Sequence, residues 1–144
     1  MKNILSTILC ATLVVSCAIL PSCGKKPEET AAVKKIVVGF SQIGAESGWR
    51  SANTLSIKGE AAKRGVDLRF TDAQQQQENQ IKSLRSFIAQ KVDIIAFSPV
   101  VNTGWQSVLE EIKKAGIPVI LTDRAVDVTD DSLYVTFIGS DFIE

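Results

Sequence analysis

The apolar positions of this chain alternate between short continuous runs and stripes at helical spacing. Residues 35–40 read Lys-Ile-Val-Val-Gly-Phe, a β-branched run typical of a strand that is buried on both faces. Residues 77–90 instead repeat their apolar side chains every three or four positions, which predicts a helix with one apolar stripe. The same criteria predict strands at 35–40, 66–70, 92–97, 118–121 and 133–138, and helices at 48–64, 77–90 and about 105–115.

The predicted order is βαβαβαβ, followed by a loop and a further strand. Helical crossovers between short buried strands require a parallel sheet with helices on both faces, so we predict a doubly wound α/β domain. Residues 66–70 alternate apolar and charged side chains, which indicates an edge strand with one wetter face. Placing that strand at the edge predicts the strand order 2-1-3-4-5.

Ligands of such sheets bind beyond the carboxyl ends of the strands, near the point where the strand order reverses. That rule directs attention to three segments, residues 41–50, 98–104 and 122–124.

The first of these segments combines a carboxylate (Glu46), an indole (Trp49), a guanidinium (Arg50) and a hydroxyl at the expected start of a helix. Its glycines do not fit the G-x-G-x-x-G dinucleotide pattern, and no P-loop pattern occurs in the chain. A sugar requires that mixture, because its hydroxyls take charged donors and acceptors while its C–H face packs on an aromatic plane. The alternative is that Trp49 packs in the core while Glu46 and Arg50 are solvated.

The fourth predicted strand is followed by Thr122-Asp123-Arg124. These residues bring a carboxylate, which accepts hydrogen bonds, and a guanidinium, which donates them, to the carboxyl end of the sheet. A local ion pair is the alternative for Asp123 and Arg124. Ser41 and Ser98, after the first and third strands, are further ligand-binding candidates. Trp105 shares a helical stripe with apolar residues, so we expect it in the core. The glutamine run at 74–77 is interpreted as a solvated loop, and residues 130–131 as a surface turn.

Charge and composition narrow the classes of function. Acidic and basic residues balance, 16 of each, so the basic surface typical of nucleic-acid binding is absent. The chain contains no histidine, which removes the usual general base and the commonest zinc ligand. No calcium-loop pattern occurs either. These features favour a binding protein over an enzyme, with no metal and no cofactor.

Residues 1–23 have the three parts of an export signal: a basic start, an apolar run and small residues before Cys23. Leu20-Pro21-Ser22-Cys23 resembles the bacterial lipobox, in which the cysteine becomes the lipid-modified first residue, although Pro21 departs from that pattern. Residues 24–34 are polar and predict a flexible tether. We therefore expect an exported protein, anchored to the membrane by lipid if Cys23 is modified.

Five motifs together carry a resemblance to a known family. The motifs are Gly39-Phe40-Ser41-Gln42, Glu46-Ser47-Gly48-Trp49-Arg50, Gln77-Glu78-Asn79-Gln80-Ile81, Phe97-Ser98-Pro99-Val100 and Leu121-Thr122-Asp123-Arg124. With them, the sequence from residue 35 to residue 144 resembles the periplasmic sugar-binding proteins of ABC importers, of the ribose- and galactose-binding type. The Glu-Ser-Gly-Trp-Arg loop is most similar to the galactofuranose-binding branch.

The resemblance implies the first lobe of a two-lobed receptor, located in the periplasm or at the outer face of the cytoplasmic membrane. Such a receptor closes on a monosaccharide and presents it to an ABC permease. It implies that Asp123 and Arg124 bond sugar hydroxyls, and that Glu46, Trp49 and Arg50 supply polar contacts and an aromatic wall. Galactofuranose, galactose and ribose all remain as ligands, and the ring form stays open.

Members of the family are about twice as long as this chain, so we interpret residues 35–144 as a truncated N-terminal lobe. Three alternatives stand beside transport. A sensing protein that feeds a membrane receptor uses the same binding chemistry. A ribose/lactose-type repressor effector domain requires a helix-turn-helix where the export signal stands. A histidine-free enzyme on a flavodoxin-like fold requires a phosphate-binding loop after the first strand.

Overall fold

A computed structural model describes residues 34–140 of the chain. Within them, five strands form one parallel sheet in the order β2-β1-β3-β4-β5, which confirms the predicted fold and strand order. The strands are β1 (Val37–Gln42), β2 (Asp67–Asp72), β3 (Ile94–Phe97), β4 (Val119–Thr122) and β5 (Thr136–Ile138). The helices are α1 (Gly48–Lys63), α2 (Gln77–Ala89) and α3 (Gln106–Lys114), with the 3-10 helix η1 (Asp131–Leu133) before β5.

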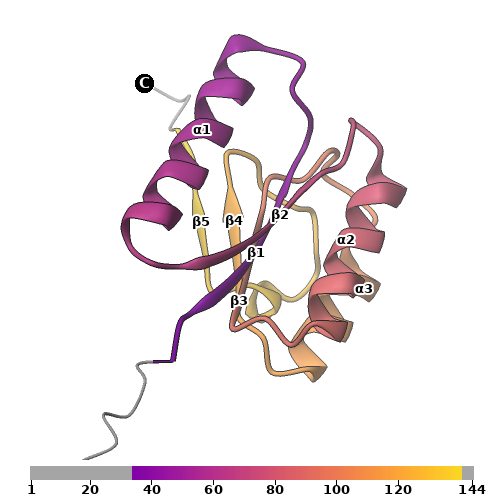
Figure 1. The fold of residues 1–144 in the computed structure, drawn as a ribbon. Coiled ribbons are helices and arrows are strands. Elements are labelled where there is room, and N and C mark those ends of the chain that lie inside the picture. Colours follow the sequence, from indigo (N-terminus) through magenta and orange to yellow (C-terminus); the bar gives the residue numbers. More distant parts are fainter. Residues whose placement is uncertain (1–33, 141–144) are drawn as a thin grey trace, which may run out of the picture. The chain divides into compact units, whose positions relative to one another are not determined.

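The core lies between the sheet and the two helices α2 and α3, which cover the same face (Figure 1). Leu84 and Phe87 of α2 are fully buried there, and so is Trp105, as the sequence predicted. The ring of Trp105 packs on Phe97 of β3, with 5.1 Å between the ring centroids. Gly39 permits the close approach of α2, because a Cβ there would lie 2.6 Å from the Phe87 ring.

The opposite face is covered by α1, which packs quite differently (Figure 1). Arg50 is the one buried residue of α1, and the apolar side chain of Leu55 is exposed to solvent. Beneath the helix, Phe40 stacks on Phe70 at 6.0 Å, and the Lys58 ammonium lies 4.1 Å above the Phe70 ring. Because α1 buries little apolar surface, polar contacts near its N-terminus carry much of its attachment.

The structure corrects several predicted boundaries. The fifth strand was expected from residue 133, but Leu133 lies in η1 and is buried in the core, so β5 begins only at Thr136. The Asp130 side chain accepts a hydrogen bond from the Ser132 amide, which turns the chain there and delays the strand. The first strand extends to Gln42, two residues beyond its expected end.

The predicted export signal (1–23), the candidate lipidation site Cys23 and all but the last residue of the predicted tether lie outside the described residues. Among residues 34–140, no helix has the length and apolar character needed to cross a membrane.

Candidate functional site

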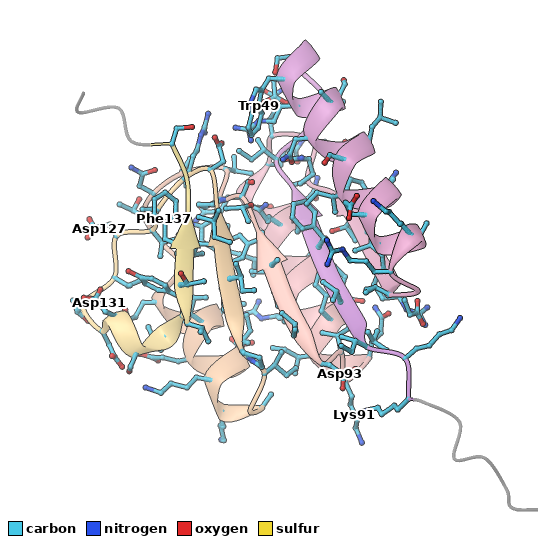
Figure 2. The ribbon with its side chains drawn as sticks, turned by 90° about the vertical axis from the view of Figure 1, so that its left-hand side faces the viewer. Trp49, Lys91, Asp93, Asp127, Asp131 and Phe137 are labelled. Carbon is cyan, nitrogen blue, oxygen red and sulfur yellow. The ribbon has the colours of Figure 1, made fainter. Side chains whose placement is uncertain are left out.

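A cleft of about 550 Å³ opens at the carboxyl end of the sheet. Figure 2 shows Trp49 at this end of the domain and Lys91 and Asp93 at the opposite end. The cleft is therefore where a ligand of a doubly wound sheet is expected. Its lining residues come from the β1–α1 loop, the first turn of α1, the turn after β4 and the segment after β5: Glu46, Ser47, Trp49, Arg50, Asp123, Arg124 and Ser140.

The start of α1 fixes two of these side chains. Ser47 is the N-cap, with φ −144° and ψ 158°, and its hydroxyl accepts a hydrogen bond from the Arg50 amide at 3.2 Å. This cap satisfies one of the amides that a helix leaves unpaired at its N-terminus. Trp49 and Arg50 consequently sit in the first helical turn, at the edge of the cleft.

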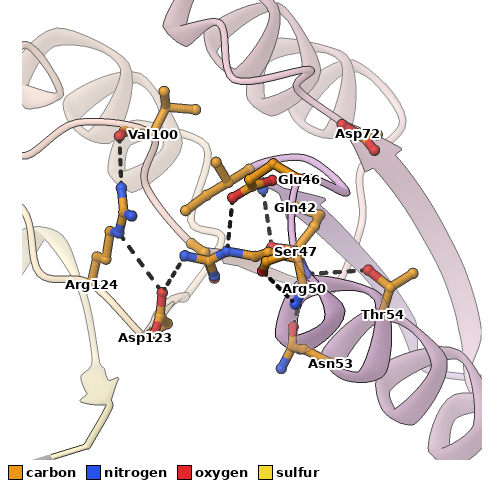
Figure 3. A network of polar contacts seen from close by, with 12 residues as sticks. Gln42, Glu46, Ser47, Arg50, Asn53, Thr54, Asp72, Val100, Asp123 and Arg124 are labelled. Carbon is orange, nitrogen blue, oxygen red and sulfur yellow. Dashed lines mark hydrogen bonds and ion pairs between the residues drawn. The ribbon is translucent and has the colours of Figure 1, made fainter.

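Four charged side chains of alternating sign run across the cleft (Figure 3). The Arg50 guanidinium donates through Nε to Glu46 at 3.3 Å, and its Nη2 lies 2.7 Å from the Asp123 carboxylate. That carboxylate also lies 3.9 Å from the Arg124 Nε. The set joins the β1–α1 loop to the end of β4, and its formal charges cancel.

Arg50 is the centre of this set and has spare hydrogen-bonding capacity. Its side chain is only 6% exposed, yet its Nη1 is buried with no hydrogen-bond partner. The Trp49 ring covers the guanidinium, with 4.7 Å from Cζ to the ring centroid. An unpaired buried donor is costly unless something else satisfies it, so Nη1 is a ready donor for a bound hydroxyl.

The chain makes a tight turn at Asp123. Its φ is +66°, and the Arg124 amide donates to the Thr122 carbonyl at 2.7 Å, which closes a three-residue γ-turn. The turn sends two consecutive charged side chains into the cleft. Arg124 is held from the other side, because its Nη1 donates to the Val100 carbonyl at 3.1 Å.

Five of the seven candidate ligand-binding residues thus line one cleft. The alternative for the first loop is wrong for Trp49, which is 54% exposed, and for Arg50, which is buried, whereas Glu46 is exposed as that alternative expects. The local ion pair between Asp123 and Arg124 is present at 3.9 Å, but Asp123 forms a shorter one, at 2.7 Å, with Arg50.

The other two candidates, Ser41 and Ser98, are buried and do not line the cleft. Ser41 belongs to β1, where alternation places its side chain on the same face as Gly39, toward α2. The Ser98 hydroxyl shares a 2.8 Å hydrogen bond with Thr122. Ser41 differs from its predicted position because β1 continues to Gln42, whereas β3 ends at Phe97 as predicted and the Ser98 hydroxyl is taken up by its bond to Thr122.

The glutamine run is more than a solvated loop. Gln74 and Gln75 both have positive φ, and the Gln75 amide donates to the Ile43 carbonyl at 2.7 Å, so this turn is tied to the first loop. Gln77 begins α2, and its side-chain Nε2 donates to the Thr103 carbonyl at 2.7 Å. Several contacts at this end of the sheet are therefore made by side-chain carboxamides, such as those of Gln77 and Gln80, which composition alone does not distinguish from surface residues.

Two further hollows lie at the opposite end of the sheet, around Gly116 and Ile117. Neither contains a connected set of buried charges comparable to that around Arg50. Among residues 34–140, no group of three or more His, Cys, Asp or Glu side chains is placed to hold a metal ion.

Comparison with known proteins identifies the family of this chain. The family model described as "Periplasmic binding protein domain" matches residues 38–144. The galactofuranose-binding protein YtfQ of Escherichia coli K12 is 58% identical over 108 residues, which cover 75% of this chain and 34% of that protein.

Solved structures give the same result. A Mycobacterium smegmatis protein in complex with β-D-fucofuranose is 65% identical, with a TM-score of 0.74, over 75% of this chain and 36% of that one. The binding protein of the arabinose ABC transporter from Shewanella sp. ANA-3, bound to L-arabinofuranose, is 60% identical, with a TM-score of 0.73. That match covers 74% of this chain and 35% of the Shewanella protein, so this chain spans about a third of the length of these relatives.

Proposed function

Because the chain belongs to the periplasmic binding protein family, we propose that it forms the first lobe of a two-lobed receptor that captures a monosaccharide for an ABC importer. The receptor binds the sugar outside the cytoplasmic membrane and releases it unchanged. Arg50 and Asp123, with Glu46, Trp49 and Arg124 around them, form the rim that this lobe contributes.

The observation that carries this proposal is the charge-balanced set centred on Arg50. Two carboxylates and two guanidinium groups together present many donors and acceptors but no net charge, which suits a neutral polyol better than an ionic ligand. Nη1 of Arg50 offers a buried donor that lacks a partner. The half-exposed ring of Trp49 offers an apolar plane for the C–H face of a sugar.

A furanose is the sugar class that the relatives favour. The E. coli protein is named for galactofuranose, and the two solved relatives hold fucofuranose and arabinofuranose, all of them five-membered rings. Transport is favoured over sensing because the Shewanella protein is described as a component of an ABC transporter. A second lobe closes the ligand from the other side through a hinge motion, since contacts to both lobes stabilise the closed state.

Calorimetric titration of the full-length protein tests the proposal. The panel is D-galactose, L-arabinose, methyl β-D-galactofuranoside and methyl β-D-galactopyranoside, the last two being locked in one ring form each. We expect the furanoside to bind more tightly than the pyranoside. The proposed function would be overturned if the protein bound none of these four sugars.

Substitutions test the site within the same assay. Arg124→Met and Asp123→Asn each remove a charged hydrogen-bonding group, so we expect on the order of 10- to 100-fold weaker binding. Arg85→Met is the matched control, because Arg85 pairs with Glu111 between α2 and α3, away from the cleft. Unchanged affinity in both cleft variants would show that the ligand binds elsewhere.

A further inference from the structure

Two glutamine side chains, Gln42 and Gln80, are fully buried near the carboxyl ends of the strands. Buried positions are usually occupied by apolar side chains. Gln42, at the end of β1, donates to Asn53 at 2.8 Å and to Thr54 at 3.3 Å, both on α1. Gln80, on α2, instead bonds to backbone groups at the carboxyl ends of β1 and β3. Neither side chain lines the cleft, so neither contacts a ligand in this arrangement.

The Gln80 carboxamide holds three backbone groups at once. Its Nε2 donates to the Ser98 carbonyl at 2.8 Å and to the Ser41 carbonyl at 3.3 Å. Its Oε1 accepts a hydrogen bond from the Val100 amide at 2.9 Å. One side chain thereby ties the carboxyl ends of β1 and β3 to the loop that follows β3.

That loop in turn supports a residue of the cleft. The Val100 amide is bonded to Gln80, and the Val100 carbonyl accepts from Arg124 at 3.1 Å. Arg124 is about half exposed and lies 3.9 Å from Asp123, so the ion pair alone holds it loosely. The Val100 carbonyl is the second point that fixes the direction of its guanidinium.

We propose that Gln80 is a positioning residue of the ligand site, which sets the orientation of Arg124 through the backbone of Val100. This inference rests on the proposed function, because it concerns the same cleft. Gln80 acts before any ligand arrives: it holds the loop and the two strand ends in one arrangement, so that less conformational entropy is lost on binding.

The chemistry of a carboxamide is specific here. Two carbonyl acceptors require two N–H donors, and one amide donor requires an oxygen acceptor, which only Asn or Gln supplies in a single neutral group. Methionine fills nearly the same volume but leaves the Val100 amide and the Ser98 carbonyl without this partner. The backbone at Val100 is then less restrained, although the neighbouring Val101 carbonyl still accepts from the Trp105 indole at 2.7 Å, so the support that Val100 gives Arg124 is weakened.

Two measurements on the full-length protein test the role. In Gln80→Met we expect about 10-fold weaker binding of the tightest sugar of the panel, and faster hydrogen exchange at the Val100 amide, followed by NMR. On an Arg124→Met background, we expect Gln80→Met to have little further effect on affinity, because the two residues act in series.

Gln80→Glu provides a pH profile. Its protonated carboxyl donates one hydrogen bond and accepts another, whereas its carboxylate faces two carbonyl oxygens. We therefore expect this variant to bind close to wild type at pH 5 and weakly at pH 8, while wild type changes little. Leu84→Val is the control for stability alone, since Leu84 is buried on the same helix without any bond to the loops. It should lower the melting temperature and leave the dissociation constant unchanged.

The outcomes separate the two claims. If wild type binds none of the sugars, the proposed function fails, while hydrogen exchange at Val100 still tests the link from Gln80 to the loop. If wild type binds and Gln80→Met changes only the melting temperature, Gln80 is a structural residue and the positioning role is overturned. The same conclusion follows if the Gln80 and Arg124 effects are fully additive.

Discussion

Asp123 serves the cleft through its carboxylate and through its backbone. The carboxylate lies 2.7 Å from Arg50, and the φ of +66° turns the chain so that Arg124 follows into the same cleft. A non-glycine residue held in a γ-turn with positive φ is strained, at a cost of about 1–3 kcal/mol. Strain of this kind persists where the surrounding contacts hold it, and it is frequent at functional sites.

Glycine and alanine at position 123 separate those two contributions. Both Asp123→Gly and Asp123→Ala remove the carboxylate, but only glycine relieves the backbone. We expect Asp123→Ala to be less stable than Asp123→Gly by about 1 kcal/mol in the free energy of unfolding, measured with urea. At Asp72, which ends β2 with ordinary strand backbone, the order should reverse, with glycine the less stable. Equal stability at position 123 would contradict a strained turn.

At the scale of secondary-structure elements, α1 contributes residues to the site although it buries less apolar surface than α2 or α3. Arg50 is the buried residue of this helix. Hydrogen bonds from Gln42 of β1 to Asn53 and Thr54 attach the helix to the sheet. A helix with so little buried apolar surface depends strongly on its cap. The geometry of Trp49 and Arg50 therefore follows from where the helix begins.

Removing the cap should weaken α1 measurably. We expect Ser47→Ala to lower the free energy of unfolding by about 1 kcal/mol, because the Arg50 amide loses its acceptor. Ser47→Asp keeps an acceptor and should retain most of that stability. Ser56→Ala, in the exposed middle of the same helix, is the matched control and should be neutral or slightly stabilising. A Ser47→Ala variant as stable as wild type would show that α1 does not depend on this cap.

At the scale of the whole domain, the two ends of the sheet are held by different chemistry. The cleft lies at the carboxyl end, whereas Asp93 joins the starts of β1 and β3 at the opposite end (Figure 2). Its carboxylate accepts from Lys34 and from the Val37 amide, each at 2.8 Å. Both hydrogen bonds lower the pKa of Asp93 below its ordinary value of 3.8, and the bond from Lys34 has the larger effect.

The sign of the resulting pH dependence follows from that direction. A carboxyl whose pKa is lower in the folded state stabilises the fold above the unfolded-state pKa, and this stabilisation is lost as the pH falls through the folded-state pKa. We expect an NMR titration of Lys34→Met to show the pKa of Asp93 moved upward toward 3.8. Asp93→Asn should leave sugar affinity at neutral pH unchanged, because the cleft is at the other end. Weaker sugar binding in that variant would indicate coupling through the sheet.

Much of the fold could be predicted from sequence because its determinants are local. Apolar periodicity distinguishes a buried strand such as β3 from an amphipathic helix such as α2 without knowledge of any partner. The wetter second strand then fixes the edge, and the edge fixes the strand order. The largest error in an element start, at Leu133, arose because burial against a distant core overrode the strand propensity of its neighbours.

The residues of the candidate site likewise separate into those that local sequence places and those that distant contacts place. The sequence by itself determined that Glu46, Trp49, Arg50, Asp123 and Arg124 would meet, because the carboxyl ends of parallel strands share one edge. Only the tertiary structure decided that Ser41 faces α2 and that Gln80 bonds three loop groups, since both depend on which backbone atoms lie opposite a side chain. Those neighbours are distant in sequence, and no local pattern encodes them.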